Sequence, residues 1–344
     1  MKKILKTVAF IGIALSAVCC AKAVKEGAND ANKRYFDAWM SINHPGLKPT
    51  ALGTYVVEEV PGTGNAITEE NYVYANYTVT DLQGNISSYT QAETAKQLGA
   101  YTPADYYGPK VLTTFEGTIP AGVMDALVGM KVGGKKKVII PSWLMTYNTY
   151  DTPEEYLENS SQGTDCIYDI EVTDVAVNID QHEVRQMAQY FADNGDVFGI
   201  FTSADSLAGH YGCYYKQLIA PVDTTSFPSD TTIYINYTGK LLNGLVFDTT
   251  IEKVAKDNNI YTAGRAYEPT SITWGESYDK LTMGESNSSV ISGFALTLWQ
   301  MRAFEKGIGV FYSPLGYSYN GSGSSIPPYS PLVFEIEIVA KPEE

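Results

Sequence analysis

The 344-residue sequence predicts an α+β fold that is built twice in tandem. Each copy is expected to be a curved antiparallel sheet packed on one short helix and preceded by an amphipathic helix. Three observations support this: the predicted elements of the first half return in the same order in the second, several segments alternate apolar and polar residues, and each half holds one obvious short central helix. Because one apolar sheet face needs one cover, a single helix per sheet is sufficient.

The N-terminus has the features of a bacterial secretory signal. Three lysines flank an apolar run, Val8–Val18, which is too short to span a bilayer permanently and ends at two cysteines. A cysteine directly after such a run indicates a lipoprotein processing site. Cys20 is favoured over Cys19 because the residue before Cys19 is branched; plain secretion with a coincidental cysteine pair is the alternative. We therefore expect a signal peptide over residues 1–19 and a lipid anchor in the bacterial cell envelope, on the periplasmic or the outer surface.

The charge balance argues against one class of partner. Lysine and arginine number 24 against 39 aspartates and glutamates, which gives a formal net charge of −15. Such a surface repels phosphate groups, so nucleic acid is not an expected partner. The hydrophobic fraction of 44% supports a folded protein with a core in each copy.

The cysteines and histidines predict no metal site and no cofactor. Cys166 and Cys213, in the body of the chain, lie in apolar, strand-like segments. Two buried thiols are the favoured interpretation, and a disulfide in an oxidising compartment is the alternative. No histidine lies at ligand spacing from a carboxylate or a cysteine, and the sequence has no P-loop, dinucleotide fingerprint or Gly-x-Ser-x-Gly elbow.

The first half begins, after the lipid site, with a tether and a helix over residues 20–46. Aromatic and apolar residues at helical spacing predict the helix over Asp30–Ile42. Strands are then expected at Gly53–Val60 and Asn71–Thr80, inside a first repeat that covers residues 47–178.

The second half repeats this order. Asp180 and Glu183 have the spacing of a capping box and predict a helix that ends at Asp193, within a connecting segment of residues 179–206. The second repeat, residues 207–344, then opens with strands expected at Gly212–Ala220 and Thr232–Tyr237.

Later segments of the two halves also match. Gly122–Leu144 and Gly293–Leu315 each predict a short helix, a glycine turn and a strand. Each half closes with an alternating strand, Ile167–Val175 in the first and Leu332–Val339 in the second. The chain is therefore interpreted as a duplication.

One stretch of the second half carries the candidate chemistry. Ile233–Thr250 alternates apolar and polar residues, turns at Asn-Gly and ends on an aromatic–acid pair. This pattern predicts a hairpin that brings Tyr237, Phe247 and Asp248 to one place.

The same hairpin resembles the opening of FKBP-type peptidyl-prolyl cis-trans isomerases, which carry Tyr-Thr-Gly, a short turn and Phe-Asp-Thr/Ser. Further family motifs follow in order: Val-Ile-x-Gly-aromatic at 290–294, Leu-Gly-Tyr at 315–317, and Ile-Pro-Pro at 326–328 with Phe334 in the last strand. The family's usual tryptophan is Phe294 here, which keeps a ring at the pocket floor but makes the pocket shallower.

The resemblance implies a site for a proline ring and its peptide bond. Its residues are Tyr237, Phe247, Asp248, Val290, Ile291, Phe294, Tyr317, Ile326 and Phe334. Asp248 is expected to hydrogen-bond near Tyr237, the Ile291 backbone N–H to meet the substrate carbonyl after proline, and Tyr317 to offer its hydroxyl to the substrate backbone. Any one of these residues on its own is more typical of core packing.

The resemblance also implies a function. The chain is expected to be an envelope-anchored peptidyl-prolyl isomerase and folding helper, whose second repeat acts on X-Pro bonds of exported, proline-containing polypeptides. The alternative is a non-catalytic binding or scaffold lipoprotein with the same fold.

The first repeat is expected to fold alike without catalysing. Tyr77 stands where Tyr237 does, but Ser87 and Ser88 occupy the Phe-Asp place and Val123 replaces the floor ring. A second departure from the family is the spacing of 42 positions between Asp248 and Val290. There we expect a helical turn near residues 251–257 and a polar loop over residues 276–289, which could cover the pocket or recruit a partner.

Overall fold

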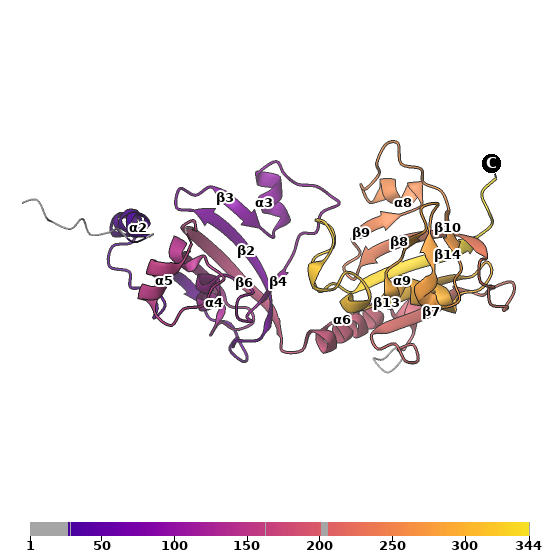
Figure 1. Cartoon of the computed structure of the whole chain (residues 1–344), viewed down its shortest axis with the longest axis horizontal. Helices are drawn as coiled ribbons and strands as arrows, with labels where there is room; N and C mark the ends of the chain where they lie inside the picture. The colour runs from indigo at the N-terminus through magenta and orange to yellow at the C-terminus, as the bar shows by residue number, and fades with distance from the viewer. Residues whose placement is uncertain (1–26, 28, 162, 201–205, 344) are drawn as a thin grey trace, which may run out of the picture.

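The computed structural model describes residues 27, 29–161, 163–200 and 206–343. Over these residues the chain forms two sheet modules that lie end to end and are joined by a helix (Figure 1). The expected signal peptide and the candidate lipidation sites Cys19 and Cys20 lie outside the described residues. In the described part, no helix combines the length and apolar character needed to cross a membrane.

The elements of the first module follow one another in a simple order. They are α2 (Asp30–Asn43), β1 (Tyr55–Val60), β2 (Tyr72–Asp81), β3 (Ile86–Tyr89), α3 (Ala92–Gln97), β4 (Lys110–Thr113), α4 (Ala121–Leu127), β5 (Lys135–Ile140), the 3-10 turn η1 (Ser142–Leu144), α5 (Pro153–Asn159) and β6 (Cys166–Ala176).

The second module repeats this series after the connecting helix. Its elements are α6 (Ile179–Asp193), α7 (Gly195–Phe198), β7 (Cys213–Ile219), β8 (Thr232–Leu241), β9 (Val246–Thr249), α8 (Glu252–Asp257), β10 (Thr270–Thr273), η3 (Tyr278–Lys280), β11 (Thr282–Met283), β12 (Ser288–Ser289), α9 (Ser292–Gln300), β13 (Lys306–Phe311), η4 (Ser313–Leu315), η5 (Ser318–Asn320) and β14 (Leu332–Val339).

The two sheets have the same strand order, which confirms the predicted tandem α+β fold. Among the described residues the first sheet runs β1-β5-β6-β2-β3, with β4 paired to β2. The second runs β7-β13-β14-β8, with β9 and β10 both paired to β8. Every strand pair in both sheets is antiparallel, as expected for sheets with one face packed on a core.

A short helix covers the inner face of each sheet, as predicted. In the second module the helix α9 is buried from Gly293 to Leu298. A side chain at Gly293 would meet the Phe311 ring at 2.2 Å, so the missing Cβ lets the helix lie directly on β13. In the first module α4 buries Val123, Ala126 and Leu127 in the same way.

The two longer helices pack on the modules that follow them. Helix α2 buries Phe36 and Met40 in the first core. Helix α6 buries Val184, Met187 and Phe191 against the outer face of the second sheet. The apolar faces predicted for these helices are therefore covered within the chain itself.

The predicted capping box at Asp180 is wrong. The N-cap of α6 is Asn178, whose side chain accepts a hydrogen bond from the Gln181 N–H at 2.9 Å. Because the helix starts earlier than the pattern indicated, Glu183 lies beyond the cap position and is buried at 0% exposure instead.

The polar loop expected over residues 276–289 is also partly wrong. Thr282–Met283 and Ser288–Ser289 pair as a short hairpin that extends the second sheet beyond β10. The turn between them includes Gly284 at φ 71°, a backbone conformation that glycine adopts at no steric cost. Strands of two residues are too short to produce an alternating pattern.

The segment that follows the first hairpin is duplicated as well. In the first module Tyr101 and Tyr107 stack with ring centroids 5.2 Å apart, and in the second Tyr261 and Tyr267 stack at 5.3 Å. A lysine from the preceding short helix lies over the first ring of each pair. The stacked pair and its lysine are thus common to both copies, but the interval from Asp248 to Val290 is 42 positions whereas that from Ser88 to Ile119 is 31.

The two cysteines of the described chain are buried and unpaired, as the favoured interpretation predicted. Cys166 lies in β6 and Cys213 in β7, so they belong to different sheets. Burial raises the pKa of both thiols to about 12.

Candidate active site

The predicted site residues converge in the second module. Eight of them belong to one apolar cluster, in which Tyr237, Phe294, Ile326 and Phe334 are buried and Phe247, Val290, Ile291 and Tyr317 are partly buried. They come from β8, β9, the entry to α9, the segment before β14, and β14 itself. The fold therefore assembles residues that are almost a hundred positions apart in the chain.

Phe334 lies at the centre of the aromatic contacts. Its ring centroid is 5.0 Å from Phe294, 5.6 Å from Phe247 and 6.1 Å from Tyr237. Phe294 is 2% and Phe334 5% exposed, so these two rings form the floor. The partly buried side chains of the set pack against these two rings in the same cluster, which gives this part of the module an apolar, aromatic character.

The position of Phe247 depends on Gly239 in the neighbouring strand. A Cβ on Gly239 would lie 2.5 Å from the Phe247 ring and 2.9 Å from the Phe334 ring. Glycine is therefore required at this point because the two rings lie directly against the backbone of β8.

Asp248 lies at the edge of this floor and holds two neighbours. The Tyr237 hydroxyl donates to Asp248 Oδ2 at 2.5 Å, and the Arg265 guanidinium lies 2.7 Å from Asp248 Oδ1. With both oxygens engaged, the carboxylate is better suited to bracing Tyr237 than to proton transfer. Burial, followed by the charge of Asp248, raises the pKa of Tyr237, so its hydroxyl stays protonated and can donate.

Arg265 is a site residue that the sequence analysis missed. Besides Asp248, it donates to the Thr249 carbonyl at 3.0 Å and lies 5.1 Å from the centroid of the Tyr267 ring. The sequence analysis did not find the pairing with Asp248 because Arg265 lies in a long connecting segment. A comparison of the two copies could have found it, because the stacked tyrosine pairs align Arg265 with Asp105 of the first module.

Two hydrogen-bond donors at the site have no partner among the described residues. One is the backbone N–H of Ile291, which is the N-cap residue of α9. The other is the hydroxyl of Tyr317, whose pKa is raised by burial and then by the nearby charge of Asp248. Both are the groups expected to meet a substrate backbone, although their roles remain predictions.

Residues 313–330, here called the pocket loop, carry Tyr317 and Ile326. The first residue of this loop, Ser313, is bound by Glu183 of helix α6. The Ser313 N–H donates to Glu183 Oε2 at 2.6 Å and its hydroxyl to Oε1 at 2.7 Å. Burial raises the pKa of Glu183 to about 7, because the loss of hydration outweighs the two hydrogen bonds.

The first module lacks the corresponding groups. Its α4 has Pro120 as the N-cap, where α9 has Ile291, so the backbone donor is absent. Tyr77 and Tyr168 keep two rings at a centroid distance of 6.2 Å, but Ser88 takes the place of the aspartate. The missing backbone donor and the missing carboxylate agree with a first module that has the same fold as the second but lacks a complete site.

The described residues do not include a group of three or more histidine, cysteine, aspartate or glutamate side chains that could hold a metal ion. The chemical groups at the site are apolar rings, one braced carboxylate and two hydrogen-bond donors. Such a set can bind and orient an uncharged amide, but it offers no nucleophile.

The second module matches a family of known activity. Residues 224–339 match the family model described as FKBP-type peptidyl-prolyl cis-trans isomerase. A probable FKBP-type peptidyl-prolyl cis-trans isomerase of Haemophilus influenzae is 30% identical over 159 residues, which cover 46% of this chain and 55% of that protein. FK506-binding protein 1 of Dictyostelium discoideum is 27% identical over 112 residues, 33% of this chain and 82% of that protein.

A solved structure of FkpA from Escherichia coli is 22% identical, with a TM-score of 0.29, over 51% of this chain and 72% of that chain. The chain spans only about half the length of the Haemophilus influenzae relative. The second repeat, in which the assembled site lies, is therefore similar to FKBP-type peptidyl-prolyl cis-trans isomerases over residues 224–339.

Proposed function

We propose that the second repeat catalyses cis–trans isomerisation of X-Pro bonds in polypeptides. The observation that carries the proposal is the convergence of eight apolar residues and Asp248 around two backbone-directed donors that have no partner among the described residues. The family match over residues 224–339 supports the same activity.

The reaction needs no covalent chemistry. Resonance holds an amide planar against a rotation barrier of roughly 18–20 kcal/mol, and unaided X-Pro bonds isomerise in tens of seconds or more. Resonance also places partial charges on the amide oxygen and nitrogen. An apolar surface stabilises that charge separation poorly, whereas the twisted state carries less of it, so the barrier falls.

The residues of the site then have separable tasks. Phe294 and Phe334 provide the apolar floor for the proline ring. The N–H of Ile291 and the hydroxyl of Tyr317 would hold the peptide backbone on either side of the rotating bond. Asp248 and Arg265 would keep Tyr237 in place at the edge of the floor.

The proposal is tested by following isomerisation of an X-Pro peptide, either by protease-coupled cleavage or by NMR exchange, with the full chain. We expect turnover by the wild type, a loss of about tenfold or more for Asp248→Ala, and a smaller loss for Tyr317→Phe. Wild-type rates equal to those in buffer would reject the isomerase and leave the non-catalytic binding protein.

The first repeat supplies the matched control. Ser88→Ala changes the residue that stands in the place of Asp248 and should leave the rate unchanged. If the variant with both Asp248→Ala and Tyr317→Phe retains no rate above buffer, the first repeat is inactive. A residual rate that falls with Ser88→Ala would instead assign catalysis to both repeats.

We further propose that the protein is anchored in the bacterial cell envelope by a lipid on Cys20 and acts on exported proteins. The apolar run that ends at the cysteine pair supports this. Mass spectrometry of the purified chain, with Cys20→Ser and Cys19→Ser variants, tests it. We expect the lipid and membrane fractionation to be lost with Cys20→Ser and kept with Cys19→Ser; an unmodified wild-type chain would exclude the anchor.

A further inference from the structure

The pocket loop holds two non-glycine residues in a strained backbone conformation. Ser318 has φ 52° and Tyr329 φ 57°, both in the left-handed region that non-glycine residues rarely adopt. The two residues are joined by a hydrogen bond from the Tyr329 N–H to the Ser318 carbonyl at 3.0 Å, which closes the base of the loop. Such conformations persist where surrounding structure holds them.

The tip of the loop is a tight hairpin that carries Ile326 of the candidate site. Ser322 and Ile326 exchange backbone hydrogen bonds of 2.7 and 3.1 Å. Ile326 is 4% exposed within the aromatic cluster, whereas Gly323 and Ser324 at the tip are exposed. A movement of the tip would therefore move a wall of the site.

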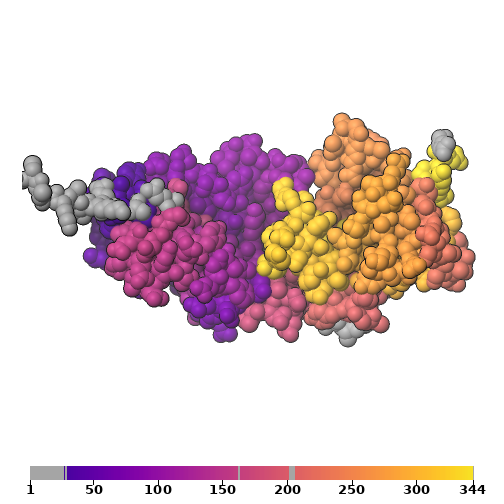
Figure 2. Space-filling view, in the orientation of Figure 1, coloured from indigo at the N-terminus to yellow at the C-terminus, as the bar shows by residue number. Residues whose placement is uncertain are grey.

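The first repeat holds this tip. Its residues 101–108, here called the docking loop, bring Asp105 and Tyr106 against Ser324. The Tyr106 N–H donates to the Ser324 carbonyl at 2.9 Å, and the Ser324 hydroxyl donates to the Asp105 carboxylate. In Figure 2 the segment around the pocket loop lies directly against the first repeat.

Two further contacts support the loop from outside the second sheet. The Tyr106 side chain packs against the apolar cluster that contains Ile326. The Tyr72 ring of β2 meets the Tyr329 ring edge-on at a centroid distance of 5.3 Å, so the strained residue rests on the first sheet. The start of the loop is fixed separately by Glu183.

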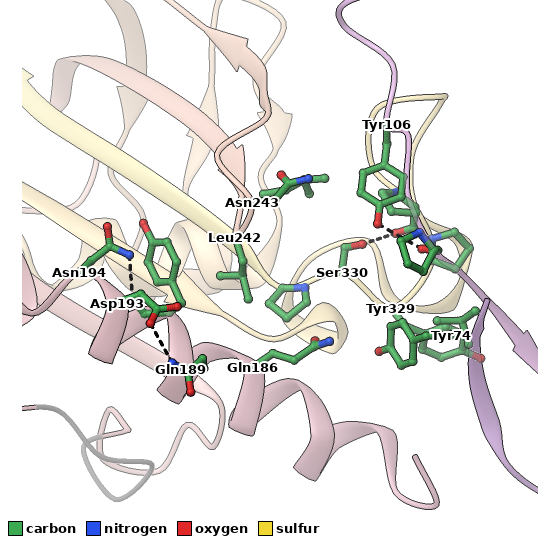
Figure 3. Close-up of a pocket in the computed structure, with 17 residues that line it drawn as sticks. Tyr74, Tyr106, Gln186, Gln189, Asp193, Asn194, Leu242, Asn243, Tyr329 and Ser330 are labelled. Carbon is green, nitrogen blue, oxygen red and sulfur yellow. Dashed lines mark hydrogen bonds between the residues drawn. The ribbon is translucent and has the colours of Figure 1, made fainter. Parts of the chain in front are cut away.

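Open space flanks the contact between the docking loop and the tip of the pocket loop. Cavities of about 480 and 260 Å³ flank it, and Tyr106 lines both. Figure 3 shows the larger one, with Tyr106 and the pair Tyr74 and Tyr329 along one side and the α6 residues Gln186 and Gln189 on the other. Because open space lies on either side, the side chains of Asp105 and Tyr106 support the tip, and substitution can remove that support.

We propose that the docking loop of the first repeat is a positioning element for the active site of the second repeat. The inference rests on the proposed isomerase activity. In the first repeat the position of the site arginine is occupied by Asp105, which binds the neighbouring module instead of an aspartate of its own site. The first repeat, which lacks a complete site, thus supports the part of the second repeat's site that carries Ile326.

The test uses the full chain with Asp105→Ala, Tyr106→Ala and Ser324→Ala. For Asp105→Ala we expect kcat/KM to fall about two- to fivefold, because an exposed charge-assisted contact is lost. For Tyr106→Ala we expect about three- to tenfold, since the packing of the aromatic side chain against the apolar cluster is lost, although the backbone N–H still donates to Ser324. Asp105→Ala combined with Ser324→Ala should cost no more than the larger single loss, because both remove the same bond.

The matched control is Glu93→Ala, which breaks the exposed Glu93–Lys96 pair in α3, close to the docking loop in sequence. It should leave kcat/KM unchanged. Amide hydrogen exchange gives a readout independent of activity: the N–H groups of Ser322 and Ile326 should exchange faster in the Tyr106 variant, while those of β14 stay protected.

The outcomes separate this inference from the proposed function. A wild-type chain without turnover would reject the isomerase, and the exchange rates at Ser322 and Ile326 would still decide whether the docking loop holds the tip. An active wild type with unchanged kcat/KM and unchanged exchange in the Asp105 and Tyr106 variants would overturn the inference.

Discussion

The buried carboxylate of Glu183 predicts an unusual dependence of stability on pH. It is 0% exposed, and burial raises its pKa from 4.5 to about 7. Because the folded state holds the proton more tightly than the unfolded state, the contribution of Glu183 to stability is complete below pH 4.5. It is lost as the pH rises through about 7.

The magnitude follows from the two pKa values. A change from 4.5 to about 7 corresponds to roughly 3 kcal/mol of unfolding free energy across the whole range. About 2 kcal/mol of this falls between pH 5.5 and 8.5, a range that stays above the sequence pI of 4.7 and so avoids precipitation.

Other titratable groups near Glu183 determine the design of the experiment. Asp180 on the same helix contributes to the raised pKa of Glu183, and Tyr74, Tyr312 and Tyr329 face it with pKa values that are themselves raised, so these tyrosines stay neutral. His182 acts in the opposite direction. Burial lowers its pKa, so its contribution to stability grows as the pH rises from the lowered folded-state pKa toward 6.5, and it levels off above that value.

The assay is therefore a difference between the wild type and Glu183→Gln, measured by denaturant unfolding at a series of pH values. We expect the wild type to lose about 2 kcal/mol relative to the variant between pH 5.5 and 8.5. Asp193→Asn, an exposed carboxylate at the other end of α6, should run parallel to the wild type. A difference between wild type and Glu183→Gln that does not change with pH, or that changes in the opposite sense, would refute the reasoning.

Three further predictions concern the second repeat and the thiols. Arg265→Gln removes the ion pair with the site aspartate and should lower kcat/KM about two- to fivefold in the peptide assay without changing the fold; an unchanged value would remove this residue from the site. Gly239→Ala places a Cβ 2.5 Å from the Phe247 ring and should destabilise the chain by about 1–3 kcal/mol in denaturant unfolding, and a neutral effect would contradict the ring placement. With pKa values of about 12, Cys166 and Cys213 should resist a thiol reagent at pH 8 until the chain unfolds, in a variant whose two N-terminal cysteines are serine; rapid labelling of the native chain would show that they are accessible.

Much of the fold could be predicted because the patterns that specify its strands and turns involve residues that are close in the sequence. The alternation along β8 and the Asn-Gly turn after it specify a hairpin whichever module surrounds them, and the observed strand alternates buried and partly buried residues. The order of motifs from Phe247 to Phe334 also nominated candidate site residues, and the fold brings the apolar ones together in one cluster. A duplicated order of elements then predicted two sheets, and these have the same strand order.

Where prediction failed, the deciding interactions were non-local or short. The two-residue strands β11 and β12 carry no readable period. Glu183 had the spacing of a cap residue, yet its partner is Ser313, 130 positions away. Arg265 reaches back to Asp248 across a segment whose path cannot be inferred from its composition.

The sequence alone determined that this protein is a duplicated α+β chain, and it predicted a site in the second copy, because strand period, turn residues and motif order are properties of neighbouring residues. The tertiary structure alone decided that Arg265 braces the site, that Glu183 is buried beside the pocket loop, and that the first repeat touches the wall of the second through Asp105 and Tyr106. The contacts of Glu183, Asp105 and Tyr106 depend on how two packed modules and a connecting helix fit together, and the Arg265 pair depends on the path of a long connecting segment; no local sequence pattern specifies either.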